Sequence, residues 1–288
     1  MCAKSRAREL SGVVATVGDA TVGFAFYVVE GNRCSIGDIY VSKPARDIGA
    51  DGRMVAAILE KLDPLARLRR IECQSVSIGN RAATDVFIAR GFDSLERHYM
   101  LARADFRRTA ADIEARAGEG VKNRLLDISV RPWQDDDFAD AAQIIHRSYR
   151  GEHDSRINSQ YRSEEGCAEL LSILTDHIWC GDFLPTVSRV AANRATNQLV
   201  GVLIASRISP GVGHIGQISI LPAYQGLGIG RLMVTATLNE YNGRGFSDVS
   251  LAVTGANLPA LHLYQSCGFK TVHRFPVFFK QWSAAGRR

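Results

Sequence analysis

The chain of 288 residues is 46% hydrophobic and 23% charged, a balance typical of a globular protein long enough for two domains. Its formal net charge of +5 is mildly basic, and without a dense basic run carrying interleaved aromatic residues we expect no nucleic-acid partner. The six cysteines form no C-x-x-C pair, so we expect no metal site. No apolar run is long enough to span a bilayer, so we expect no membrane partner. The start has no apolar core typical of a signal peptide, so we expect a cytoplasmic location.

In the first third of the chain, the hydrophobic pattern predicts strands that alternate with helices. Apolar alternation bounded by glycine-containing turns indicates the strands, and apolar residues at helical spacing indicate the helices. We expect strands at 12–17, 23–29, 34–41, 71–78 and 94–102, and helices at 54–62 and 81–90. The Ala-, Arg- and Glu-rich segment 105–124 then predicts a linker.

The rest of the chain continues this alternation over a longer stretch. We expect strands at 125–130, 186–193, 199–208, 214–220 and 249–253, and helices at 135–149, 164–179 and 231–238. Asp135-Asp136-Asp137 opens the first of these helices, where negative charge suits the helix dipole, although three carboxylates could also hold a metal ion. Segment 151–163 is predicted to be a polar loop.

A glycine-rich stretch, Gln225-Gly226-Leu227-Gly228-Ile229-Gly230, follows the strand that ends at Ile220 and precedes a helix. The first amides of a helix have no internal partners and the helix dipole favours negative charge, so such a loop can bind a phosphate. The glycines keep side chains away from the backbone. The G-x-G-x-G spacing differs from that of dinucleotide-binding folds, and no Gly-Lys-Ser/Thr follows as in a Walker loop.

A second motif lies downstream, where Asn257, Ala260, Tyr264, Gly268 and Phe269 stand in the pattern N-x-x-A-x-x-x-Y-x-x-x-G-F after a predicted strand. The glycine loop itself has the form Q/R-x-x-G-x-G/A. In this order and spacing, the two motifs resemble those of the GNAT family of acyl-CoA-dependent N-acyltransferases. The resemblance implies an α/β fold with a mixed, mostly antiparallel sheet flanked by helices, and a complete GNAT domain over 125–288.

Residues 1–104 look like a second copy of the same fold. Asn80, Phe87, Gly91 and Phe92 repeat the spacing of the second motif, and the segment 47–54 parallels the glycine loop. We therefore expect a tandem arrangement of two GNAT-like domains.

The N-terminal copy is degenerate at the positions that matter for chemistry. Asp47 and Asp51 take the places of Gln225 and Ile229, and two carboxylates would repel a pyrophosphate. Phe87 stands in the place of the motif tyrosine and has no proton to give. This copy is also shorter, because the first strand and the two helices that shape the acceptor pocket in the family have no counterpart. We expect a structural pseudo-domain, with residual CoA binding as the alternative.

The resemblance implies acetyl-CoA as the acyl donor and an amine as the acceptor. In the family, the strand before the glycine loop separates from its neighbour and pairs with the pantetheine arm, while the loop holds the pyrophosphate. The matching residues here are Ile218, Ser219 and Ile220 for the arm, and Gln225, Gly226, Gly228, Gly230 and Arg231 for the pyrophosphate. Asn257 either contacts the cofactor arm or caps the helix that follows it.

Tyr264 matches the family tyrosine that protonates the departing thiolate, and a phenol with an ordinary pKa of about 10 suits that role. For the general base, many members carry a Glu at the place of Gly216, and His214 is predicted on the same strand face. An imidazole with an ordinary pKa of about 6.5 can accept a proton at neutral pH. Proton transfer through water is the alternative to His214. Gln217 is predicted to point to the opposite face.

The loop 151–163 together with Glu164, Glu165 and Asp176 is predicted to form the acceptor side, although exposed helix charges would explain these carboxylates equally well. We expect an N-acetyltransferase that acts on a small-molecule amine, with a protein N-terminus or a Lys side chain as the second choice. The rival from another class is a non-catalytic CoA-sensing module that binds a partner protein. The oligomeric state is left open.

Overall fold

The computed structural model describes residues 11–74, 81–104, 125–176 and 181–282. They form two compact units: the first takes in the described residues up to Arg97 and those from Arg274 onward, and the second runs from His98 to His273. Two long strands, β5 (Asp93–Arg103) and β12 (Lys270–Gln281), begin in one unit and end in the other. The predicted linker lies outside the described residues, as do the last residues of the strand predicted at 71–78 and of the helix predicted at 164–179.

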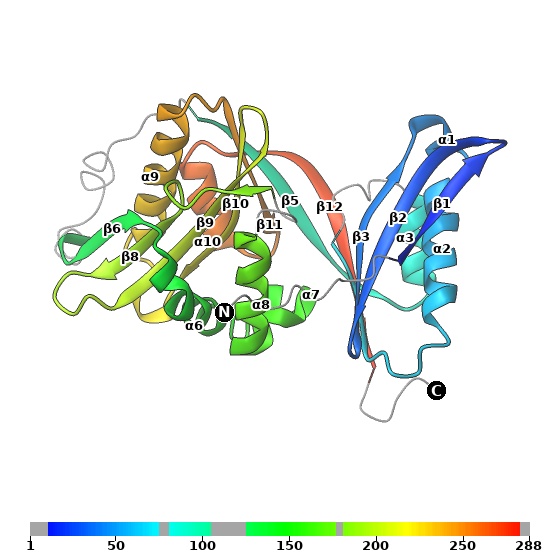
Figure 1. Cartoon of the computed structure of the whole chain (residues 1–288), viewed down its shortest axis with the longest axis horizontal. Coiled ribbons are helices and arrows are strands. Elements are labelled where there is room, and N and C mark those ends of the chain that lie inside the picture. Colours follow the sequence, from blue (N-terminus) through cyan, green and yellow to red (C-terminus); the bar gives the residue numbers. More distant parts are fainter. Residues whose placement is uncertain (1–10, 75–80, 105–124, 177–180, 283–288) are drawn as a thin grey trace. The chain divides into compact units, whose positions relative to one another are not determined.

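The first unit contains a sheet with the strand order β1-β2-β3-β4-β12 (Figure 1). Its strands are β1 (Ser11–Val17), β2 (Ala20–Glu30), β3 (Arg33–Val41), β4 (Arg70–Cys73) and the end of β12. Neighbouring strands pair antiparallel, except that β3 and β4 are parallel. The last strand comes from the far end of the sequence, because residues 278–281 pair with β4.

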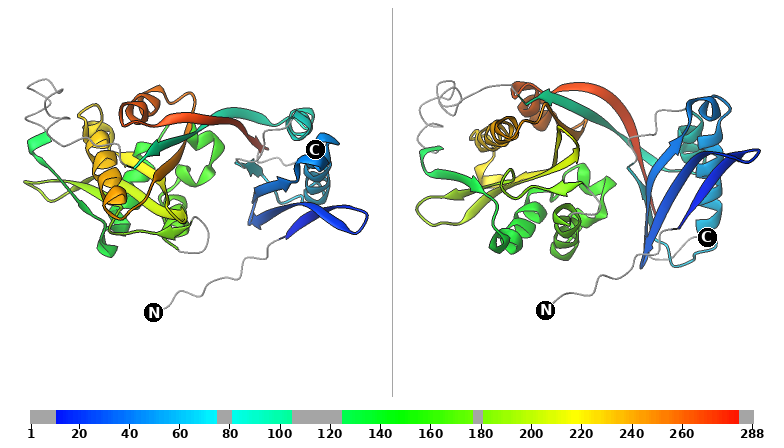
Figure 2. Two further views of the ribbon diagram at one scale, coloured as in Figure 1. Left: turned by 90° about the horizontal axis from the view of Figure 1, so that it is seen from above. Right: turned by 45° about the horizontal axis from the view of Figure 1, so that its top comes forward.

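Helices α2 (Ala50–Leu62) and α3 (Arg81–Ala89) cover one face of this sheet, and the short helix α1 (Lys43–Asp47) precedes them (Figure 2). The buried residues of β3 are Cys34, Ile36, Ile39 and Val41, so the alternation expected for a strand with one covered face shifts by one residue at an irregularity between Ile36 and Ile39. Phe87 of α3 stacks on Phe278 of β12 with 4.4 Å between ring centroids, so both ends of the sequence contribute to this core.

The second unit contains a sheet with the strand order β5-β11-β10-β9-β8-β6, and β7 adds to β9. The strands are β6 (Ile128–Pro132), β7 (Asp182–Phe183), β8 (Arg189–Asn193), β9 (Leu199–Ser209), β10 (Val212–Ile220) and β11 (Asp248–Thr254). The pairs from β6 to β10 are antiparallel, whereas β10 and β11 are parallel. Helical elements are η1 (Asp135–Asp137), α6 (Phe138–Ser148), α7 (Asp154–Ile157), η2 (Ser159–Arg162), α8 (Glu164–Thr175), η3 (Pro222–Tyr224), α9 (Ile229–Gly243) and α10 (Leu258–Ser266).

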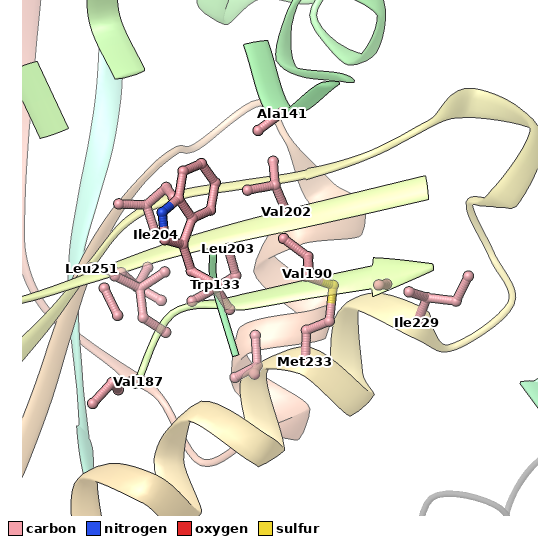
Figure 3. Close-up of a cluster of buried hydrophobic side chains, with 14 of the residues drawn as sticks. Trp133, Ala141, Val187, Val190, Val202, Leu203, Ile204, Ile229, Met233 and Leu251 are labelled. Carbon is pink, nitrogen blue, oxygen red and sulfur yellow. The ribbon is translucent and has the colours of Figure 1, made fainter. Parts of the chain in front are cut away.

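The core of the second unit lies on both faces of its sheet. Figure 3 shows Ala141 of α6 on one side of the strands and Met233 of α9 on the other, with Val202 and Leu203 of β9 between them. All four side chains are buried, with at most 1% of their surface exposed. The two helices therefore hold β9 and β10 from opposite sides, which fixes the strand that leads to the glycine loop.

The acidic triplet at the start of η1 has a structural explanation. Asp137 is buried and accepts hydrogen bonds from Arg131 Nη2 at 2.6 Å and from the Gln134 backbone N–H at 2.8 Å. The hydrogen bond to Asp137 raises the pKa of Arg131. In the described part of the chain, no cluster of three or more His, Cys, Asp or Glu side chains is arranged to hold a metal ion. Nor does any described helix combine the length and apolarity needed to cross a membrane.

The two units repeat the same local geometry. Phe87 and Phe92 make an edge-to-face contact with centroids 5.1 Å apart, and Tyr264 and Phe269 make the equivalent contact at 5.8 Å. In both pairs the later residue donates its backbone N–H to the carbonyl of the earlier one at 3.0 Å. The four-residue parallel pairing of β3 with β4 likewise corresponds to that of β10 with β11.

The predicted fold class, α/β with a mixed, mostly antiparallel sheet flanked by helices in each unit, is confirmed, and most predicted elements are present. Helix α2 begins at Ala50, four residues before the predicted start, because Gly49 in the left-handed conformation caps it. The predicted loop 151–163 contains the short helical elements α7 and η2. These turns carry no sustained apolar period, so the pattern could not indicate them.

Candidate active site

Strand β10 separates from β11 halfway along its length. Their parallel pairing joins Val212–Ile215 to Asp248–Leu251, and no later pair joins the two strands in the described chain, although β10 continues to Ile220. On its other edge, β10 stays paired with β9 to the end, where Ile220 lies opposite Gly201. The second half of β10 thus leaves its parallel neighbour while it remains anchored to the rest of the sheet.

Gly216 forms a bulge where the separation begins. Ile215 lies opposite Ala205 and Gln217 lies opposite Ile204, so Gly216 is an extra residue with no partner of its own in this ladder. A bulge changes which face of the sheet the following residues point to.

The bulge makes the predicted orientation of Gln217 wrong. A Cβ at Gly213 would meet the ring of Tyr241 on α9, whereas a Cβ at Gly216 would meet Leu174 of α8. Gln217 also points to the side of α6 and α8, as its hydrogen bonds below show. Strict alternation would place Gly213 and Gln217 on one face. The signal in the sequence was the glycine inside a strand, which often marks a bulge.

The glycine loop presents an uncapped helix start. Gly226 and Gly228 have φ values of +74° and +82°, a region that other residues rarely adopt. Gly228 is the N-cap of α9, and the first intrahelical bond of that helix runs from Leu232 N to the Gly228 carbonyl at 3.0 Å. In the described residues no side chain caps this end and no acidic residue lies in its first turn, so its amides are available to an anion.

A cavity of about 800 Å³ lies between the glycine loop, the separated end of β10 and helix α10. Its wall includes ten of the eleven predicted site residues, namely Ile218, Ser219, Ile220, Gln225, Gly226, Gly228, Gly230, Arg231, Asn257 and Tyr264. The structure therefore brings the two sequence motifs together around one space. What each residue does there stays a prediction.

Two of these residues also brace the cavity wall. Gln225 Nε2 donates to the Ile220 carbonyl at 3.1 Å, and Ser148 Oγ donates to the same oxygen at 2.9 Å. Asn257 accepts a hydrogen bond from the backbone N–H of Ala260 at 3.1 Å as the N-cap of α10. The helix-capping alternative for Asn257 is thus present in the structure, and its place on the wall leaves the predicted cofactor contact open as well.

Tyr264 lies on the wall with 6% of its surface exposed, and the edge-to-face contact with Phe269 orients its ring. His214, the predicted base, lies before the bulge and is not among the described residues that line the cavity. Its Nδ1 is 2.9 Å from Ser250 Oγ, and its backbone N–H donates to the Tyr241 hydroxyl at 3.2 Å. Burial raises the pKa of Tyr241, which therefore serves here as a neutral hydrogen-bonding group.

The segment predicted to form the acceptor side follows α6, and part of it lines the cavity. Tyr149, Glu152 and His153 line it, whereas Glu164, Glu165 and Asp176 do not belong to its described wall. The segment is held to the sheet because Thr254 Oγ1 donates to the buried Asp154 carboxylate at 2.8 Å. Sequence reasoning named this loop but did not single out Tyr149, whose place at the end of a helix is also typical of core residues.

Comparisons with known proteins find similarity to acetyltransferases. The family model of the acetyltransferase (GNAT) family matches residues 155–269. The mycothiol acetyltransferase of Rhodococcus opacus is 41% identical over 64 residues, which is 22% of this chain and 21% of that protein. The mycothiol acetyltransferase of Tsukamurella paurometabola is 29% identical over 185 residues, 59% of this chain and 63% of that protein. The chain thus spans only about a fifth of the length of the first of these relatives.

Solved structures show the same fold. A GCN5-related N-acetyltransferase from Sphaerobacter thermophilus superimposes with a TM-score of 0.68 at 17% identity, covering 94% of this chain and 80% of that one. A tandem GNAT protein from the clavulanic acid biosynthesis pathway gives a TM-score of 0.60 at 14% identity, covering 96% and 84%. At these identities the likeness concerns the fold alone. Residues 155–269 therefore match the acetyltransferase (GNAT) family, and the chain has the fold of tandem GNAT proteins.

Proposed function

We propose that the second unit transfers an acetyl group from acetyl-CoA to the primary amine of a small molecule. The observation that carries this proposal is the single cavity in which the uncapped start of α9, the separated end of β10 and Tyr264 meet. A pyrophosphate seat, an open strand edge and a phenol are three of the features that direct transfer from a CoA thioester to an amine uses.

Each part of the wall has a role in this proposal. The amides of Ile229, Gly230 and Arg231 bind the pyrophosphate, and the guanidinium of Arg231 adds positive charge. The backbone of residues 218–220 binds the pantetheine arm and aligns the thioester. The amine nitrogen forms a bond to the thioester carbonyl carbon, the carbon–sulfur bond breaks, and Tyr264 gives its proton to the departing sulfur.

The attacking ammonium must first lose a proton. Glu152 and His153 line the cavity, and His214 does not, although water could connect His214 to the amine. The family resemblance favoured His214 or water, and the geometry adds the two loop residues as proton acceptors. An amine acceptor is favoured because the proposed acceptor side carries the Glu152 carboxylate and the Tyr149 ring, both of which attract a cation, and a small-molecule amine is our first choice among such acceptors.

The test is release of the CoA thiol from acetyl-CoA by the full chain with a panel of amines. The panel contains an amino sugar, an aliphatic diamine, a peptide with a free N-terminus and a peptide with an internal Lys. We expect turnover with a small amine and slower or no turnover with the peptides. Turnover confined to the peptides would overturn the choice of acceptor. Tight acetyl-CoA binding with no thiol release would overturn the enzyme and leave a CoA-sensing module.

A further inference from the structure

Gln217 is the centre of a hydrogen-bond network beside the cavity, and only 3% of its surface is exposed. Its Nε2 donates to the Tyr149 hydroxyl at 3.1 Å and to Ser219 Oγ at 2.9 Å, and its Oε1 accepts from the Tyr161 hydroxyl at 3.0 Å. Nε2 is also 3.4 Å from the Ile218 carbonyl oxygen, which can only accept. This contact fixes which end of the amide faces each partner.

The two phenols that share this amide also stack on one another. The rings of Tyr149 and Tyr161 are parallel to within 5° and their centroids are 3.9 Å apart. Tyr149 lines the cavity, whereas Tyr161 is not among the described residues on the wall and lies behind it. His146 Nδ1 lies 3.3 Å from the Tyr161 carbonyl oxygen. Ring stacking and the shared amide therefore fix both the plane of Tyr149 and the direction of its hydroxyl.

We propose that Tyr149 contacts the acceptor amine, and that Gln217 and Tyr161 are positioning residues that act through Tyr149. This rests on the proposed function. Tyr149 and Glu152 lie on the same wall, so a cationic amine between them meets a carboxylate and an aromatic ring. Because the Tyr149 hydroxyl accepts from Gln217, its own proton is directed away from that amide and can be donated to a polar atom of the acceptor.

The experiment compares three single variants and one double variant of the full chain. Tyr149→Phe removes the contacting hydroxyl, Gln217→Leu replaces the amide with a shorter apolar side chain, and Tyr161→Phe removes one hydroxyl behind the wall. Tyr40→Phe, an exposed tyrosine in the first unit, is the matched control. Initial rates are measured with the best amine of the panel at saturating acetyl-CoA, then with acetyl-CoA varied, and CoA binding is measured by calorimetry.

We expect Tyr149→Phe and Gln217→Leu each to raise the KM for the amine about tenfold, and Tyr161→Phe to raise it about threefold. The KM for acetyl-CoA and the Kd for CoA should change by less than about threefold, because the pyrophosphate seat is untouched. Gln217→Leu combined with Tyr149→Phe should be no worse than the worse single variant, since Gln217 acts through Tyr149. Additive effects, or an unchanged KM for the amine in Tyr149→Phe, would overturn the proposal.

Failure of the proposed function has a different signature. If the wild type binds CoA but acetylates no amine, the same amines are tested for binding to the CoA complex by saturation-transfer NMR. Binding that Tyr149→Phe weakens would uphold the acceptor contact while the enzyme assignment falls. No amine binding at millimolar concentration would overturn the acceptor contact too. If Gln217→Leu does not fold, the two Tyr→Phe variants, which delete one oxygen each, still decide the outcome.

Discussion

Helices α2 and α9 start in the same way and differ in what they offer a ligand. Both follow a glycine in the left-handed conformation, Gly49 at φ +71° and Gly228 at φ +82°. The first turn of α2 contains Asp51, which is 5% exposed, whereas α9 has no acidic residue there. The start of α9 opens on a cavity of about 800 Å³. The one described beside α2 is about 230 Å³, and its wall is apolar apart from Thr16 and Arg53.

This difference shows that the same backbone geometry at a helix start can either hold a carboxylate of the chain itself or remain available to a bound anion. A helix start attracts an anion in either unit, and in the first unit the chain supplies that anion itself as Asp51. A carboxylate in the first turn satisfies the dipole and repels a phosphate from the same place. Phe87 extends the contrast, because it is fully buried in the place that corresponds to the cavity-lining Tyr264. The first unit thus keeps the architecture and is expected to lack the chemistry.

The strongest test replaces Tyr264 of the second unit with phenylalanine, the residue that the first unit has at the corresponding position, Phe87. Tyr264→Phe should lower kcat by about 100-fold or more, because a general acid contributes about 10²- to 10⁴-fold, while the Kd for acetyl-CoA changes little. Thiol-release kinetics and calorimetry measure the two quantities. Tyr40→Phe is the control. An unchanged kcat would mean that Tyr264 gives no proton in the rate-limiting step.

The next test brings a carboxylate to the start of α9. Gly228→Asp should weaken acetyl-CoA binding at least about 100-fold, since like charges about 4 Å apart repel by about 4 kcal/mol near a protein surface. A side chain has room there, because its Cβ would lie 3.6 Å from Leu125, an ordinary contact. Gly228→Asn is the matched control, since Asn tolerates the left-handed conformation and carries no charge. Equal losses in the two variants would show that backbone strain, not charge, was responsible.

The reverse change should have a smaller effect. Asp51→Asn removes the charge from the start of α2 and should lower the free energy of unfolding by about 1 kcal/mol, the usual size of a charge–dipole contribution. Urea unfolding measures this, with the exposed Asp47→Asn as control, expected within about 0.5 kcal/mol of wild type. In a Gly228→Asp background, Asp51→Asn should not restore CoA binding. Restored binding would mean that the Asp51 carboxylate alone prevents the first unit from binding CoA.

The smallest effect concerns the cysteines, which behave alike in both units. Burial, followed by the nearby charge of Glu164, raises the pKa of Cys167 to about 11, so its thiol stays protonated at pH 8. Cys34, Cys73 and Cys267 are buried as well. Of the six cysteines in the chain, we expect at most the remaining two to react with a thiol reagent before urea is added. Reaction of a third thiol in the native protein would contradict this burial.

The sequence indicated well the fold and most of the residues that line the cavity, because both depend on local patterns. The glycine loop and the closing motif each lie within one short segment, and ten of the eleven predicted site residues share one wall. The acceptor side depends on contacts between distant segments. Gln217 meets Tyr149 and Tyr161 only because a bulge at Gly216 turns it toward them, and alternation alone predicts the opposite face.

The pairing of β12 with β4 could not be predicted from the local sequence pattern either. Residues 278–281 have the apolar character of a strand, but the neighbouring sequence does not indicate that they pair with β4, about two hundred residues earlier. Pairing between such distant segments depends on the whole fold, and no motif encodes it.

The position of β12 in the sequence determines when the first unit can complete its folding. During synthesis, the core around Phe87 stays incomplete until Phe278 emerges from the ribosome, because the two rings stack on each other. The helices of the first unit are made early, yet its sheet receives β12 only after residues 98–273 of the second unit have been made. A nascent chain that stops before Phe278 therefore exposes β4 as an unfinished sheet edge and leaves Phe87 without its stacking partner.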